Sequence, residues 1–133
     1  MKRDVIIRIA GLQRNISNEP TAVECRGSLQ SADGLHYIRY IDHDGLNTLI
    51  KLSPGRAVVT RSGKLSSVME FTEGSCTSCI YPTPYGNFDT DIETKSISLN
   101  GDFPEMDITI RYSLTMNDQT VSECELNIRT SPC

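Results

Sequence analysis

The fold is decided by residues 106–116, which read MDITIRYSLTM. Apolar or aromatic side chains occupy every second position from Met106 to Met116, and polar or charged side chains occupy the positions between them. A repeat of two over this length predicts a β-strand with one buried face, because a helix would need apolar residues about every 3.6 positions.

Paired turn residues divide the chain N-terminal to this strand. Gly34, Gly45, Gly55, Gly63 and Gly74 each follow Asp, Pro, Ser or Glu, and they lie 8 to 11 residues apart. The intervals are rich in Ile, Val, Leu, Tyr and Thr. Short strands with turns at this spacing indicate an antiparallel all-β barrel or sandwich.

The same patterns predict about ten strands and no helix. The expected strands are Lys2–Gln13, Thr21–Ala32, Leu35–Asp42, Leu46–Leu52, Arg56–Arg61, Lys64–Phe71, Cys76–Tyr81, Asn87–Leu99, Met106–Met116 and Val121–Arg129. Arg14–Pro20 is expected to be a loop, and turns are expected at Asn100-Gly101 and Asn117-Asp118. A flat sheet of this size would leave two long open edges, so we expect an antiparallel up-and-down barrel of about eight to ten strands.

Length and charge limit the classes of function. The 133 residues suit one domain, expected over residues 1–133, and the net charge of −4 with a pI of about 5.1 offers no basic footprint for nucleic acid. Asp4 and Arg8 interrupt the apolar N-terminal residues, and no segment is apolar enough to span a bilayer as a helix. We therefore expect a cytoplasmic protein with neither a nucleic-acid nor a membrane partner.

Five cysteines, an odd number, favour free thiols in a reducing compartment. Cys76 and Cys79 have the spacing of a redox or zinc motif. No helix is expected after Cys79, and no second pair of ligands stands at a suitable distance in the sequence. A structural role is therefore the favoured interpretation, with no metal and no cofactor expected.

Several pieces of the chain, taken in order, resemble the YwiB-like family of bacterial proteins. The pieces are Ile6–Gly11, Tyr37–Tyr40, Thr48–Leu52, Arg61–Gly63, Met69–Phe71, Tyr81–Phe88 and Ile110–Leu114. They extend over nearly the full length, and Tyr81–Phe88 is the most specific of them. The resemblance implies a lipocalin-like (calycin) β-barrel, and it implies no catalytic residue, cofactor or partner.

The remaining charged motifs favour ordinary surface roles. His36 and His43 stand beside the Asp42-His43-Asp44 segment, which is expected to be a solvated turn. The acidic residues Asp89, Asp91 and Glu93 alternate along one strand face that is expected to meet water. No nucleophile motif completes a catalytic set, so we expect a protein without enzymatic activity.

A binding role in the barrel interior is the first functional hypothesis. The ligand would be a small apolar or amphipathic molecule, with Phe71, Phe88, Ile110 and Tyr112 as wall residues and Arg61 as an anchor at the barrel mouth. The alternative is a filled barrel that serves as a protein-interaction module or a homodimer, through an edge strand or the aromatic segment Tyr81–Phe88. That segment is equally consistent with a lid and with a rigid corner.

Overall fold

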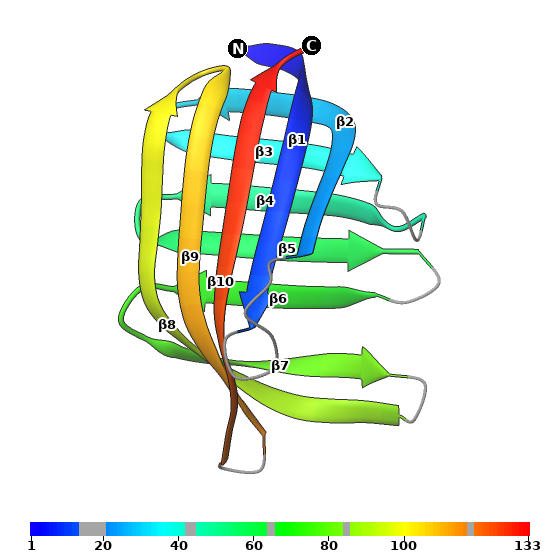
Figure 1. Ribbon diagram of the computed structural model, residues 1–133, viewed down its shortest axis with the longest axis vertical. Helices are drawn as coiled ribbons and strands as arrows, with labels where there is room; N and C mark the ends of the chain where they lie inside the picture. The colour runs from blue at the N-terminus through cyan, green and yellow to red at the C-terminus, as the bar shows by residue number, and fades with distance from the viewer. Residues whose placement is uncertain (14–20, 42–44, 64–65, 84–85, 117–118) are drawn as a thin grey trace.

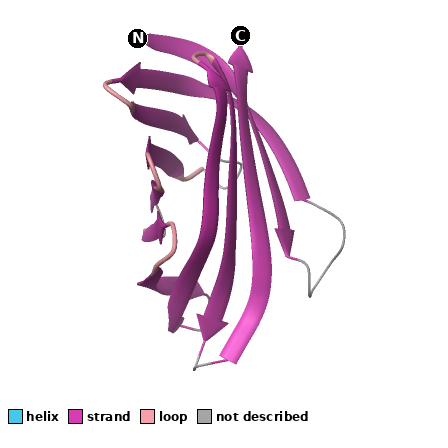
Figure 2. Cartoon of the chain, turned by 90° about the vertical axis from the view of Figure 1, so that its left-hand side faces the viewer, coloured by secondary structure: helices cyan, strands magenta, loops and turns pink. Residues whose placement is uncertain are grey.

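The structure, a computed structural model, describes residues 1–13, 21–41, 45–63, 66–83, 86–116 and 119–133. Its ten strands are β1 (Lys2–Gln13), β2 (Thr21–Ala32), β3 (Leu35–Ile41), β4 (Asn47–Ser53), β5 (Arg56–Ser62), β6 (Ser67–Thr72), β7 (Cys76–Thr83), β8 (Gly86–Asp102), β9 (Glu105–Met116) and β10 (Gln119–Pro132). Every regular element of the described residues is a strand (Figure 2). None of the described residues forms a helix long and apolar enough to cross a membrane.

The strands form one antiparallel sheet in the order β6-β5-β4-β3-β2-β1-β10-β9-β8-β7. Strands that follow one another along the chain therefore pair, except β6 and β7, which stand at the two ends of the order. β1 also pairs with β10 and brings the two ends of the chain together. The sheet folds into two layers, in which β1, β8, β9 and β10 run crosswise to β3–β6 (Figures 1 and 2). This is the all-β antiparallel barrel that the strand pattern predicted.

Two local features turn the sheet from one layer into the other. In β2, a Cβ placed on Gly27 would lie 2.2 Å from the Arg39 carbonyl oxygen and 2.5 Å from Ile7 Cδ1, so only glycine fits where the strand bends. In β8, the register shifts between Thr94 and Ser96, which is a β-bulge. Bulges bend the strand that carries them.

The barrel is nearly closed. β6 and β7 stand at the two ends of the strand order and lie side by side, but no ladder joins them within the described residues. The Thr77 hydroxyl donates to the Glu70 carbonyl across this seam. The backbone of the intervening turn bonds to β8 instead: the Gly74 N–H donates to the Thr94 carbonyl at 2.9 Å, and the Thr94 N–H donates to Ser75 at 3.1 Å. These bonds hold the turn against β8, and a narrow seam remains between β6 and β7.

Alternation of side chains places the core between the layers. Its buried apolar residues are Val5, Ile7, Leu29, Ile38, Ile50, Leu52, Ala57, Val59, Phe71, Ile92, Met106, Ile108, Ile110 and Ile128. Each layer supplies about half of them, so each layer needs the other to shield its apolar inner face from water. Burial of this shared face is the main favourable term in the stability of the barrel.

Most predicted elements are confirmed, and one turn is not. Asp33 and Gly34 have φ of 53° and 78°, as a type I′ hairpin requires. The turn expected at Asn100-Gly101 is wrong, because Gly101 stays in the ladder opposite Met106. The chain turns instead at Phe103-Pro104, where proline has no N–H to contribute to a ladder. The expected loop at 14–20 and turn at 117–118 lie outside the described residues.

Candidate functional site

The inner face of the barrel is packed tightly at one end, which we call the filled half. It consists of the inward-facing residues Val5, Ile7, Leu29, Ile38, Leu52, Ala57, Met106, Ile108, Ile110 and Ile128, all buried. Side chains from both layers belong there to one buried apolar cluster. We therefore place no ligand in this half.

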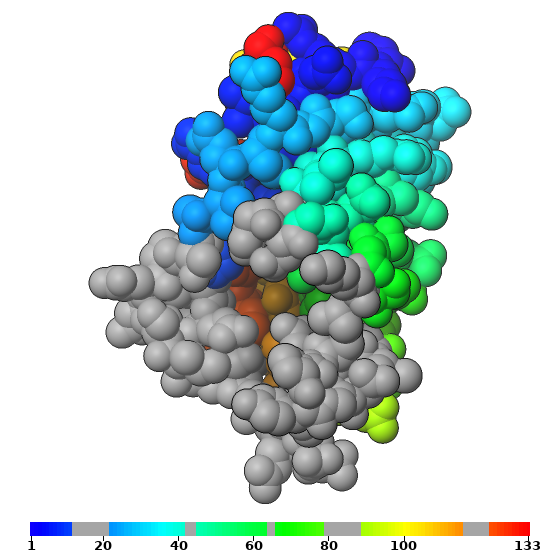
Figure 3. Space-filling model, turned by 90° about the vertical axis from the view of Figure 1, so that its right-hand side faces the viewer, coloured from blue at the N-terminus to red at the C-terminus, as the bar shows by residue number. Residues whose placement is uncertain are grey.

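The other end, the open half, behaves differently. Many of its inward-facing apolar side chains are only half-buried: Ile9, Val23, Tyr40, Met69, Tyr112, Leu114 and Leu126. Ile92, opposite Leu114, is the fully buried exception among the described residues. The half-buried side chains continue the same alternation as the filled half, two to six residues further along β1, β2, β3, β9 and β10. Figure 3 looks onto this end, and atoms of β9 and β10 are visible at the bottom of a hollow. Half-exposed apolar side chains that face inward are typical of a ligand pocket.

Three buried threonine hydroxyls face the interior without a hydrogen-bond partner. They belong to Thr48 on β4 and to Thr90 and Thr94 on β8, and each residue is at most 3% exposed. A buried hydroxyl without a partner loses its hydration and gains nothing in return, so such groups are rare in folded proteins. Their presence points to a polar guest in the interior, either water or part of a ligand.

Arg61 lies on the inner face at the mouth of the open half. Its register partners are Thr48 on β4 and Ser67 on β6, and directly opposed residues of an antiparallel pair share a face. Because Thr48 is buried in the interior, Arg61 shares the inward direction, while its position near the end of β5 leaves it exposed. No acidic residue pairs with Arg61 among the ion pairs of the described residues.

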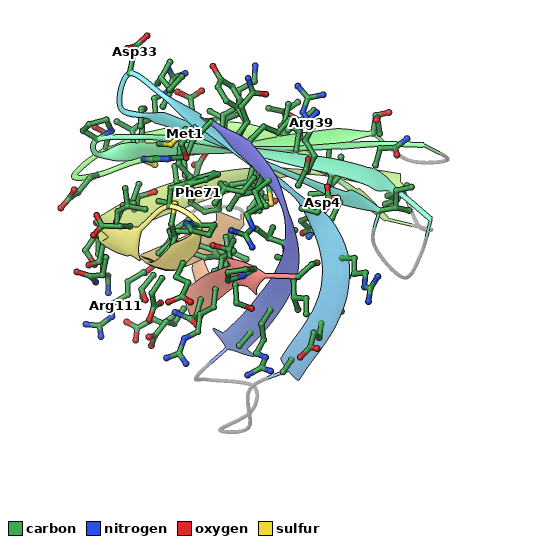
Figure 4. The ribbon with its side chains drawn as sticks, turned by 90° about the horizontal axis from the view of Figure 1, so that it is seen from above. Met1, Asp4, Asp33, Arg39, Phe71 and Arg111 are labelled. Carbon is green, nitrogen blue, oxygen red and sulfur yellow. The ribbon has the colours of Figure 1, made fainter. Side chains whose placement is uncertain are left out.

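The structure brings together two of the other predicted wall residues. Phe71 on β6 is 1% exposed and contacts the half-buried ring of Tyr112 on β9, with the ring centroids 4.9 Å apart. Phe71 lies between the two layers, as Figure 4 shows. Ile110 also faces inward, but it lies in the filled half. The side chain of Phe88 lies outside the described residues.

Three other strand arginines lie on the outer surface. Arg8, Arg39 and Arg111 are exposed, and Figure 4 shows Arg39 and Arg111 on opposite outer sides of the molecule. Arg8 Nη2 contacts Glu24 Oε2 at 2.8 Å, with both side chains more than half exposed. Exposed pairs of this kind contribute little to stability. Among these four arginines, only Arg61 can reach a guest in the interior.

His36 lies on β3, within the strand that was expected over Leu35–Asp42, and its side chain is not fully solvated. It is half-buried on the inner face of β3, at the end of the barrel away from Arg61, and its Nδ1 lies 2.7 Å from the hydroxyl oxygen of Ser31. Burial lowers the pKa of His36 below its ordinary value of 6.5, because the charged ring loses solvation. Hydrophobic alternation along Leu35–Ile41 was the signal for this placement. His43 lies outside the described residues.

The cysteines and acidic residues do not assemble a metal site in the part of the chain that the structure describes. Cys76 is exposed, and the side chain of Cys79 lies outside that part. Asp89 and Glu93 are exposed and Asp91 is half-buried, where it accepts a hydrogen bond from the Ser78 hydroxyl at 2.8 Å. No three His, Cys, Asp or Glu side chains of the described residues converge on one point.

The outer surface carries shallow depressions that differ from the interior. One, with a volume of about 520 Å³, lies over β2–β5 and includes Ser28, Arg39, Ile41 and Leu49. Another, of about 570 Å³, lies over β1, β9 and β10 and includes Arg8, Asp107 and Arg129. The Arg129 and Asp107 side chains approach to 3.3 Å there, so its charges are matched internally.

Comparison with known proteins agrees with this architecture. The chain is 28% identical, over 96 residues, to the uncharacterized β-barrel protein YwiB of Bacillus subtilis (strain 168), an alignment that covers 65% of this chain and 68% of that protein. The crystal structure of the ywiB protein from Bacillus subtilis matches with a TM-score of 0.86 and 22% identity, over 99% of this chain and 93% of that one. Residues 7–128 match the family described as a domain of unknown function, DUF1934. The chain therefore belongs to the DUF1934 family and has the β-barrel fold of YwiB.

Proposed function

We propose that this protein binds a small apolar or amphipathic molecule in the open half of the barrel and catalyses no reaction on it. The observation that carries the proposal is the contrast between the two halves of one inner face. The ten residues that define the filled half are buried, although Ile97 and Leu99 on β8 also face inward there and are half-buried and exposed. In the open half, by contrast, Met69, Tyr112 and Leu126 remain half-buried on three different strands although they point inward. Covering these side chains with an apolar guest would release water from surface that folding alone leaves wet.

The unpaired threonine hydroxyls support a guest that also carries polar atoms. Thr94 pairs in register with Tyr112, so its hydroxyl lies near the aromatic pair at the bottom of the open half. A few polar groups in an otherwise apolar pocket are the usual means of orienting a ligand.

Free cysteine thiols at Cys76 and Cys133 are compatible with the cytoplasmic location that we propose for the protein.

A pair of tryptophan variants tests the proposal. The probe is N-phenyl-1-naphthylamine, a neutral dye whose fluorescence rises in apolar surroundings. Met69→Trp fills the open half from β6, and Val58→Trp adds the same bulk at a half-buried position on the outer face of β5. We expect the wild type and Val58→Trp to bind the dye and Met69→Trp to lose most of that binding.

Two results would contradict the binding role. One is a wild-type protein that does not raise the dye's fluorescence, and the other is equal binding by Met69→Trp and the wild type. Thermal unfolding of all three proteins shows whether each variant is folded. A variant that unfolds below the assay temperature is replaced by Leu126→Trp, which fills the same half from β10.

A protein-interaction module is the second candidate, and the outer face of β3–β6 favours it. Leu35, Ile41 and Val68 are exposed large hydrophobic residues that share this face, with Ile41 63% and Val68 55% exposed. Arg39 and Lys51 lie on the same face without an ion-pair partner among the described residues. A second copy would oppose like charges, so this face favours an acidic partner over a homodimer. Native mass spectrometry that detects a dimer at micromolar concentration would contradict this preference.

A further inference from the structure

We propose that the guest of the open half is an anionic amphipath, a medium-chain carboxylate, whose head group binds Arg61 and Thr48 at the mouth. This inference rests on the proposed binding function and names the ligand class for the same site. It follows from three properties of the inner face: the placement of its charges, the unpaired hydroxyl of Thr48, and the depth from the mouth to the aromatic pair.

The charge on the inner face has one sign. Along the described strands, the inward-facing positions carry two arginines, Arg3 and Arg61, and no aspartate or glutamate. Arg3 lies at the filled end, opposite Leu29, so Arg61 is the cation of the open end. The protein as a whole has a net charge of −4, yet no acidic side chain of the described residues pairs with this cation. A cation beside an apolar cavity selects an anion over a neutral molecule.

Thr48 supplies a second group for the same head. It lies directly across the β4–β5 ladder from Arg61, it is 3% exposed, and its Oγ1 has no hydrogen-bond partner. The Thr48 hydroxyl could donate a hydrogen bond to a carboxylate oxygen. No group of the described residues forms a hydrogen bond with this hydroxyl. The head group would therefore satisfy two residues that the folded protein leaves without partners.

The chemistry of one guanidinium favours a carboxylate over a phosphate monoester. A planar guanidinium binds a carboxylate through two parallel hydrogen bonds and matches its single negative charge. A phosphate monoester carries close to two charges at neutral pH. Binding it without a second cation would leave excess negative charge beside an apolar interior, and the described inward-facing positions offer no second cation near Arg61.

The depth of the open half sets the length of the tail. From Arg61 and Ser67 at the mouth, the β5–β6 ladder runs past Met69 to Ala57 and Phe71. Four residues of strand correspond to about 13 Å, at roughly 3.3 Å per residue. Beyond Phe71 and Tyr112 the filled half begins. A tail of medium length fits this distance, whereas a long-chain fatty acid would extend out of the mouth.

The test compares decanoate with decanol by isothermal titration calorimetry on three proteins. They are the wild type, Arg61→Met, and the matched control Arg39→Met, which removes an arginine from the outer face two strands away. We expect the wild type to bind decanoate about tenfold more tightly than decanol, the range of one charge-assisted hydrogen-bond pair at an exposed site. Arg61→Met should lose this preference and keep its decanol affinity, while Arg39→Met should match the wild type.

The outcomes separate this inference from the binding function itself. Equal affinity for decanoate and decanol in the wild type would overturn the carboxylate assignment, and so would a preference for decanoate that survives Arg61→Met. In either case, binding of decanol would still support the cavity. No binding of either ligand would overturn the cavity. Tighter binding of decyl phosphate than of decanoate would also overturn the assignment, in favour of a phosphate head group. Thr48→Val should lower decanoate affinity and leave decanol affinity unchanged. Unchanged decanoate affinity in this variant would overturn the contact between Thr48 and the head group.

Discussion

The rings of Phe71 and Tyr112 meet edge to face across the barrel interior, with centroids 4.9 Å apart and planes inclined by 62°. Phe71 comes from β6 in one layer and Tyr112 from β9 in the other. Aromatic pairs prefer this arrangement because the positive edge of one ring meets the negative face of the other. The pair joins the two layers at the point where the filled half ends and the open half begins.

Removing the Phe71 ring should destabilise the barrel strongly. Phe71→Ala deletes a fully buried side chain and its contact with Tyr112, so we expect the free energy of unfolding to fall by about 3–5 kcal/mol. Urea unfolding followed by circular dichroism measures the change. Val68→Ala on the outer face of the same strand is the control and should shift it by no more than about 0.5 kcal/mol. Similar losses in both variants would mean that the ring is not part of the core.

Adding a methyl group at Gly27 should destabilise the bend of β2. Its Cβ would lie 2.2 Å from the Arg39 carbonyl oxygen, which is backbone and cannot move aside alone, and we expect a loss of about 1–3 kcal/mol. Gly11→Ala in β1 is the matched control. Nothing lies within 4 Å of its Cβ, so it should leave stability unchanged or raise it by about 0.5 kcal/mol. Equal melting temperatures for the two variants would contradict the close approach at Gly27.

Replacing Thr94 by valine should stabilise the unliganded protein. The substitution keeps the shape and removes a buried hydroxyl without a partner, so we expect a gain of about 1 kcal/mol in the free energy of unfolding. Thr130→Val is the control, because the Thr130 hydroxyl donates to the Pro104 carbonyl at 2.9 Å and accepts from the Met106 N–H at 3.1 Å. That variant should lose about 1–3 kcal/mol. A loss at Thr94 as well would show that its hydroxyl is bonded.

The stability of the protein should fall as the pH drops below the ordinary pKa of histidine. Because burial lowers the pKa of His36 in the folded state, the unfolded chain takes up the proton first. The contribution of neutral His36 to the free energy of unfolding is therefore fully present above pH 6.5. It is lost as the pH falls from 6.5 toward the lower pKa of His36 in the folded state. Urea midpoints measured at about pH 8 and about pH 5 should differ less in His36→Gln than in the wild type. An unchanged difference would assign the pH dependence to other groups.

Much of the fold could be predicted from local patterns alone. Alternation placed Lys2–Gln13 and Thr21–Ala32 at their observed bounds, and the Asp33-Gly34 pair identified the hairpin that follows. These signals are local because strand alternation and turn dihedrals depend on neighbouring residues. The turn was wrongly expected at Asn100-Gly101 because this pair and Phe103-Pro104 are both typical of turns. Only the pairing of β8 with β9 decides which of the two pairs forms the turn.

Alternation in the sequence was enough to place Phe71, Ile110 and Tyr112 among the inward-facing side chains, because it follows from backbone geometry. It left the direction of Arg61 open, since Val58 and Val59 put an apolar residue on each face of that strand. Only the tertiary structure decided which inward positions are filled and which are open, and that Thr48 stands opposite Arg61 without a partner of its own. Those properties depend on register and on where the strands bend, and both are set by contacts between residues far apart in the chain.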